Sequence, residues 1–142
     1  PVWLVGTSRG TISAVNAAAR LRPPRAADGL VLTSTLTGRA PGRNPRPGVA
    51  ETVYDVDLGA IRLPALLVYH RADACPRTSP GDVPALQRKL SAAPQVDTIA
   101  IDGGAAPQSD GCGPLDAHGF LGREPEAVAA IANWILAAKP SL

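Results

Sequence analysis

The stretch that decides the fold is residues 2–10, VWLVGTSRG, close to the start of the chain. Its first four residues form a short apolar run, which is typical of a strand buried on both faces. An Ala-rich helical pattern follows at residues 9–21 and ends before Pro23 and Pro24, which cannot continue a helix. The sequence therefore predicts a strand, a sharp turn and a helix in immediate succession.

The same alternation continues along the chain. Further apolar runs, each bounded by turn residues, occur at residues 29–33, 65–69 and 98–101, and helical patterns occur at residues 83–90 and 124–138. Strands that alternate with helices of this length indicate crossover connections and a parallel sheet. We therefore expect a three-layer α/β fold, with a parallel sheet of about four strands and helices on both of its faces.

Length and composition are those of a globular protein of about one domain. The chain has 142 residues, of which 45% are hydrophobic and 18% are charged. The formal net charge of +2 is spread evenly, whereas nucleic-acid binding calls for a concentrated basic face, so no nucleic-acid partner is expected. No apolar run approaches the ~20 residues of a membrane span, so no membrane-spanning segment is expected either.

Residues 6–10 match the pattern G-x-S-x-G, with Ser8 between Gly6 and Gly10. At a sharp strand-to-helix turn the backbone of the serine is strained, small neighbours make room for it, and its hydroxyl projects above the sheet. The helix that follows points its positive end at the same place, and the backbone amide of Arg9 can donate a hydrogen bond to an oxyanion. The pattern alone is weak, but the predicted strand and helix supply the context that it needs.

The chain resembles the α/β-hydrolase superfamily, and it is similar to the C-terminal half of that fold, from the nucleophile strand onward. Residues 63–73, LPALLVYHRAD, look like the strand and loop that carry the acid in this family. Residues 116–120, DAHGF, look like the loop that carries the general base before the final helix. The resemblance implies Ser8 as the nucleophile, Asp73 as the orienting acid and His118 as the base.

Nucleophilic catalysis by serine also requires a histidine and a carboxylate on chemical grounds. A serine hydroxyl is a poor nucleophile until an imidazole accepts its proton, and the imidazole must later protonate the leaving group. Histidine has an unperturbed pKa of ~6.5 and can do both near neutral pH. A carboxylate on the other ring nitrogen fixes the tautomer and stabilises the imidazolium.

Other residues compete for some of these roles. His70 is the other of the two histidines and ends a predicted strand, where a hydrogen-bonded structural role is the simpler interpretation. Asp102 also follows a strand end and could serve as the acid, whereas Asp116 is interpreted as a loop-shaping residue that bonds its own backbone. The Arg9 side chain either pairs with a nearby carboxylate, which we favour, or faces the substrate entrance and favours anionic or carbonyl-rich substrates.

The two cysteines flank the predicted acid and base. Cys75 follows Asp73 by two residues and Cys112 precedes His118 by six, in loops rich in Gly, Pro and Ser. We favour a disulfide over two free thiols; a disulfide implies an oxidising compartment, periplasmic or secreted, and free thiols would point to the cytoplasm. Neither cysteine has the spacing of a metal ligand, and a serine hydrolase with an acyl-enzyme route uses no metal or organic cofactor, so no cofactor is expected.

Two further expectations concern domain organisation. Residues 36–60 include GRAPGRNPRPG at 38–48, which we interpret as a loop or, alternatively, as a small cap over the ligand crevice. The family's second oxyanion amide comes from the N-terminal half of the fold, which has no counterpart in this sequence. We therefore expect residues 1–142 to form the C-terminal part of one α/β-hydrolase domain, completed by an upstream half of the same protein.

These features predict a serine hydrolase that cleaves ester, thioester or amide bonds of a small acyl substrate through an acyl-enzyme intermediate. An esterase is the first expectation, because the predicted cap region is short. A serine peptidase of similar fold and a non-catalytic binding module of similar fold are the alternatives.

Overall fold

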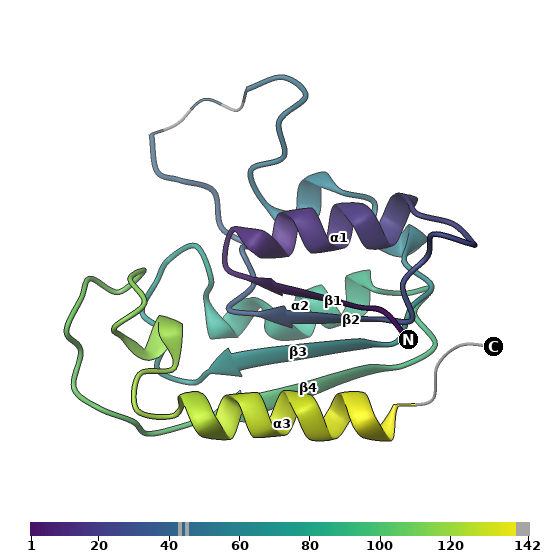
Figure 1. Ribbon diagram of the computed structural model, residues 1–142. Coiled ribbons are helices and arrows are strands. Elements are labelled where there is room, and N and C mark those ends of the chain that lie inside the picture. Colours follow the sequence, from purple (N-terminus) through teal and green to yellow (C-terminus); the bar gives the residue numbers. More distant parts are fainter. Residues whose placement is uncertain (43, 45, 139–142) are drawn as a thin grey trace.

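A computed structural model describes residues 1–42, 44 and 46–138 of the chain (Figure 1). Four strands form one parallel sheet in the order β1-β2-β3-β4, so they are neighbours in space as they are in sequence. The strands are β1 (Trp3–Thr7), β2 (Gly29–Thr33), β3 (Ala65–His70) and β4 (Val96–Ile101). Each predicted apolar run is confirmed as a strand, and the first one continues to Thr7, directly before the G-x-S-x-G serine.

Helices cover both faces of the sheet, as predicted. They are α1 (Gly10–Arg20), α2 (Val83–Lys89) and α3 (Glu124–Ala137). Figure 1 shows α1 and α2 on one side of the sheet and α3 on the other. None of the helices in the described part of the chain is long and apolar enough to cross a membrane.

The central strands are apolar on both faces because each face has its own core. Leu30 and Leu32 of β2 pack on the side of α1 and α2, whereas Val31 between them packs on the side of α3. Successive side chains of a strand point to opposite faces, so a strand covered by helices on both sides is apolar at every position. This arrangement explains the uninterrupted apolar runs of β2 and β3.

The segment at 36–60 has two parts. Short 3₁₀ turns at Val53–Asp55 and Leu58–Ala60 bring Val53 and Leu58 into the core on the α1 side of the sheet. Residues 38–42 and 46–50 instead belong to the loop that extends beyond the body of the fold in Figure 1. Residues 43 and 45 of this predicted loop or cap lie outside the described residues.

Candidate active site

Ser8 lies at the turn between β1 and α1. Its φ of +50° is in the left-handed region, which residues other than glycine rarely adopt and which concentrates at functional sites. The backbone N–H of Thr11 donates to the carbonyl oxygen of Ser8 at 3.0 Å, and the Thr11 hydroxyl donates to the same oxygen. The strand-to-helix turn therefore has the sharp, strained geometry that the sequence predicts.

The two glycines beside Ser8 differ in what surrounds them. A Cβ atom on Gly6 would lie 2.7 Å from the carbonyl oxygen of Gly10 and 2.9 Å from Cβ of Ala14, so only glycine fits there. A Cβ atom on Gly10 would meet nothing within 4 Å. Crowding therefore explains why glycine is required at position 6 but not at position 10. The crowding at Gly6 comes partly from the backbone of Gly10.

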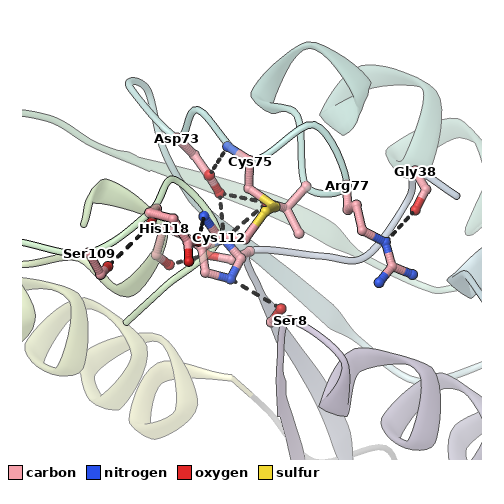
Figure 2. The surroundings of a disulfide bond; sticks show 11 residues. Ser8, Gly38, Asp73, Cys75, Arg77, Ser109, Cys112 and His118 are labelled. Atoms are coloured by element: carbon pink, nitrogen blue, oxygen red, sulfur yellow. Dashed lines mark hydrogen bonds and ion pairs between the residues drawn. A yellow bond between two sulfur atoms is a disulfide. The ribbon is translucent and has the colours of Figure 1, made fainter. Parts of the chain in front are cut away.

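His118 lies in a short 3₁₀ turn, Ala117–Gly119, and its ring points toward both Ser8 and Asp73 (Figure 2). Its Nε2 is 3.1 Å from Ser8 Oγ, and its Nδ1 is 3.2 Å from Asp73 Oδ2. A carboxylate only accepts hydrogen bonds, so the proton of the neutral ring belongs on Nδ1, and Nε2 is left to accept from the Ser8 hydroxyl. The three residues that the sequence assigns to nucleophile, base and acid are thus brought together.

The backbone of His118 is held by a residue that sequence reasoning missed. Ser34 directly follows β2, is fully buried, and donates from its hydroxyl to the carbonyl oxygen of His118 at 2.8 Å. Its φ of +44° is also in the left-handed region. A serine after a strand carries no recognisable pattern, so only the folded structure identifies this contact.

Asp73 follows the end of β3 by three residues, and its side chain is 0% exposed. Its Oδ1 accepts from the backbone N–H of Cys75 at 2.9 Å, and its Oδ2 accepts from the Thr78 hydroxyl at 2.8 Å in addition to His118. Hydrogen bonds to both oxygens compensate a buried carboxylate for the water it has lost. Thr78 is the second residue near the site that sequence reasoning missed.

The competing residues have structural partners instead. His70 is buried; its Nε2 donates to the carbonyl oxygen of Gly103 at 2.7 Å, and its Nδ1 accepts from the backbone N–H of Ala72 at 3.1 Å. The Asp102 side chain is 75% exposed, and Asp116 accepts from the backbone N–H that follows it. The described residues contain no group of three or more His, Cys, Asp or Glu that could hold a metal ion.

Cys75 and Cys112 form a disulfide, with their Cα atoms 4.7 Å apart (Figure 2). The predicted pairing is therefore confirmed. The bridge joins the loop after β3, which holds Asp73, to the loop before α3, which holds His118. It thus connects the two loops that bring the carboxylate and the imidazole together.

Arg9 contributes a backbone and a side chain to the surroundings of Ser8. Its backbone N–H, just ahead of α1, has no hydrogen-bond acceptor among the described residues. Its exposed side chain lines a cavity of about 150 Å³ together with Arg46, Glu51 and Arg77. The ion pair predicted for Arg9 is not formed with any carboxylate of the described residues.

Solved structures of known proteins share this arrangement of strands and helices. A protein assigned as a dienelactone hydrolase from Klebsiella pneumoniae subsp. pneumoniae has a TM-score of 0.57 at 18% identity, covering 96% of this chain and 52% of that one. A thermophilic esterase from Thermogutta terrifontis has a TM-score of 0.56 at 15% identity, covering 94% and 54%. Its form phosphoramylated by tabun has a TM-score of 0.56 at 12% identity, covering 99% and 56%.

These structures are α/β-hydrolase-fold enzymes, and the chain has the same fold over about half of their length. The fold that the sequence resemblance implies is therefore confirmed. No family model and no curated protein matches the sequence.

Proposed function

We propose that this chain carries the catalytic residues of a serine hydrolase that cleaves carboxylic esters of small acyl substrates, with thioesters and amides as related substrates. One observation supports this most: the chain of contacts from Ser8 Oγ to His118 Nε2, and from His118 Nδ1 to Asp73. The α/β-hydrolase fold adds support, because the nucleophile, acid and base follow one another in its sequence order.

In the proposed reaction, His118 Nε2 takes the proton of Ser8 as Oγ attacks the carbonyl carbon of the ester. The carbonyl π electrons move onto oxygen and give a tetrahedral oxyanion. This intermediate collapses, the bond to the leaving oxygen breaks, and the imidazolium protonates that oxygen to release the alcohol. Water then attacks the acyl-enzyme by the same route and releases the acid.

Asp73 acts on this sequence through His118. Its carboxylate keeps the proton on Nδ1, so that Nε2 is free to accept from Ser8. When Nε2 is protonated as well, the ring becomes a cation next to a buried anion. Because the Asp73 side chain is 0% exposed and that of His118 is 6% exposed, solvent ions screen their attraction little.

The oxyanion needs hydrogen-bond donors at the place where its charge develops. The Arg9 backbone N–H and the positive end of α1 are suited to this role, and one such donor contributes about 10²–10³ in kcat. We place a second donor in an upstream half of the same protein. Two observations support this half: β1 is an edge strand with Val5 56% exposed, and the chain covers 52% to 54% of two compared enzymes.

The disulfide bears on the compartment in which this hydrolase would work. Disulfides persist in oxidising environments and are rare in the cytosol. The Cys75–Cys112 bridge therefore favours a periplasmic or secreted protein.

The test is hydrolysis of 4-nitrophenyl acetate, butyrate and octanoate by the full-length protein and two serine variants. Ser8→Ala removes the proposed nucleophile, and we expect kcat to fall by about 10⁴-fold or more. Ser13→Ala is the matched control, because Ser13 is an exposed serine on α1, and we expect wild-type rates.

Each result bears on the proposal. Wild-type rates in Ser8→Ala would contradict the assignment of the nucleophile. A wild-type protein that cleaves peptides but none of the esters would indicate a peptidase, and one that cleaves neither would indicate a binding module of the same fold.

A further inference from the structure

Thr78 is buried between the proposed acid and base, with 3% of its surface exposed. Its hydroxyl oxygen lies 2.8 Å from Asp73 Oδ2 and 3.0 Å from His118 Nδ1. Both distances are shorter than the 3.2 Å that separates Asp73 Oδ2 from His118 Nδ1. The three atoms form a closed triangle, so the hydroxyl lies directly against the contact between carboxylate and imidazole.

The donors and acceptors of this triangle follow from chemistry. An ionised Asp73 has no proton to give, so the Thr78 hydroxyl donates its single proton to Oδ2. The lone pairs of the hydroxyl oxygen can then only accept from the Nδ1–H of His118. The Nδ1 proton is therefore shared between two oxygens, which favours the tautomer whose Nε2 accepts from Ser8.

Thr78 is also fixed relative to Asp73 within one loop. The backbone N–H of Thr78 donates to the carbonyl oxygen of Cys75 at 3.1 Å, and the backbone N–H of Cys75 donates to Asp73 Oδ1 at 2.9 Å. Cys75 is itself bonded to Cys112 of the loop before α3. The hydroxyl is thus held in place by the backbone and by the disulfide.

We propose that Thr78 is a positioning residue of this site: its hydroxyl orients the Asp73 carboxylate and holds His118 in the Nδ1–H tautomer. This inference rests on the proposed serine hydrolase function. Without the hydroxyl, Oδ2 loses a donor and Nδ1–H loses its nearer acceptor, so the ring has more freedom to turn away from Ser8. Because Thr78 is only 3% exposed, we expect no contact between it and the substrate, and the loss then belongs in kcat rather than in KM.

The test compares Thr78→Val and Thr78→Ser in the full-length protein with 4-nitrophenyl acetate as the probe substrate. Valine replaces the hydroxyl by a methyl group, and we expect kcat to fall by about 10- to 100-fold, the range seen for residues that orient a metal-bound histidine, with KM within about twofold. Serine keeps the hydroxyl, and we expect kcat within about threefold of wild type.

Thr37→Val is the matched control. The Thr37 hydroxyl donates to Asp82 Oδ2 at 2.8 Å, which is a partly buried threonine-to-carboxylate hydrogen bond with no histidine in it. We expect wild-type kcat in this variant. If Thr78→Val does not fold, Thr78→Ala provides the same comparison with serine.

A ¹H NMR measurement tests the contact between Thr78 and His118 Nδ1–H independently of catalytic activity. The Nδ1–H resonance of His118 is expected to move in Thr78→Val and to return toward its wild-type position in Thr78→Ser. Wild-type kcat in Thr78→Val, equal losses in the valine and serine variants, or an unmoved resonance would each overturn the role of Thr78. A wild-type protein without ester hydrolysis would refute the proposed function instead, and the resonance would still decide whether Thr78 orients the ring.

Discussion

Asp73 differs from the other candidate acids by its surroundings. Its side chain is 0% exposed, and its Oδ2 faces His118 Nδ1. Asp102 lies 4.0 Å from Arg71 on the surface, and Asp116 bonds the backbone of its own loop. Among the described contacts of these three aspartates, that of Asp73 alone reaches the imidazole, so its charge is the one that can act on the base.

This difference predicts unequal effects of removing the negative charges. Asp73→Asn should lower kcat for ester hydrolysis by about 10⁴-fold, because an amide beside Nδ1 no longer fixes the productive tautomer. Asp102→Asn is the control and should leave kcat within about twofold, since its carboxylate is 75% exposed. Steady-state kinetics of both variants provide the measurement. A severe loss in Asp102→Asn beside a mild one in Asp73→Asn would reverse the assignment.

At the scale of residues, the sequence could predict those that belong to a recognisable local pattern. Ser8 lies in the pattern G-x-S-x-G. Asp73 follows an apolar strand and His118 precedes the last helix, as the acid and base do in the family that the sequence resembles. Thr78 and Ser34 have no such pattern, because their contacts with His118 arise only when distant loops fold against one another. The prediction of an ion pair for Arg9 was wrong for the same reason, because the neighbouring sequence does not show whether a carboxylate lies close to Arg9 in the fold.

At the scale of elements, the turn between β1 and α1 depends on one close backbone approach. Gly6→Ala would place a Cβ atom 2.7 Å from the carbonyl oxygen of Gly10, and backbone cannot yield as a flexible side chain can. We expect the free energy of unfolding to fall by about 1–3 kcal/mol, the usual cost of overpacking.

Gly10→Ala is the matched substitution, because its Cβ atom would have no neighbour within 4 Å. Alanine also has the higher helix propensity, so this variant should be as stable as wild type or more stable by up to about 1 kcal/mol. Urea unfolding of both variants measures the difference. Equal destabilisation by the two alanines would mean that crowding at Gly6 does not shape the turn.

The loop within residues 36–60 is anchored by Asp55. Its carboxylate accepts from the backbone N–H of Thr52 at 3.0 Å and of Glu51 at 2.9 Å, and it pairs with Arg39. Burial acts to raise the pKa of Asp55, but these backbone hydrogen bonds and the Arg39 guanidinium together outweigh burial. The pKa of Asp55 therefore lies below its ordinary value.

A lowered pKa in the folded state gives the pH dependence its sign. The stability contributed by Asp55 is present above the unfolded-state pKa of ~3.9 and is lost as the pH falls through the lower folded-state pKa. Asp55→Asn keeps an acceptor oxygen but removes the charge that faces Arg39, so it should reduce the free energy of unfolding by about 0.5 kcal/mol at neutral pH. Urea unfolding as a function of pH checks this. A difference that persists unchanged at pH 2 would show that the carboxylate charge is not its source.

At the scale of the whole molecule, the sheet could be predicted because its strands are short apolar runs that alternate with helices, and the central strands β2 and β3 are buried on both faces. The packing of residues 53–60 could not, since their apolar residues lie in and around two 3₁₀ turns of three residues each, which are too short to show a helical periodicity. The pairing of the strands in chain order also depends on which faces the connecting helices cover. Contacts between segments far apart in the chain produce no local sequence pattern from which they could be predicted.

The disulfide links residues 37 positions apart and closes a loop that contains α2 and β4. Replacing both cysteines by alanine should lower the free energy of unfolding by about 2–4 kcal/mol, mainly because the unfolded chain gains freedom. We also expect a lower kcat, because Asp73 and His118 lie in the two loops that the bridge joins. Thermal unfolding and ester hydrolysis with and without dithiothreitol measure both effects. An unchanged melting temperature would contradict this account.

The nucleophilic role of Ser8 is tested most directly by covalent labelling of the full-length protein. A fluorophosphonate probe reacts with activated serines, and peptide mass spectrometry locates the adduct. We predict an adduct on the peptide that contains Ser8, in wild type and in Ser13→Ala, and none in Ser8→Ala. An adduct on another residue, or one that persists in Ser8→Ala, would contradict the assignment of Ser8 as the nucleophile.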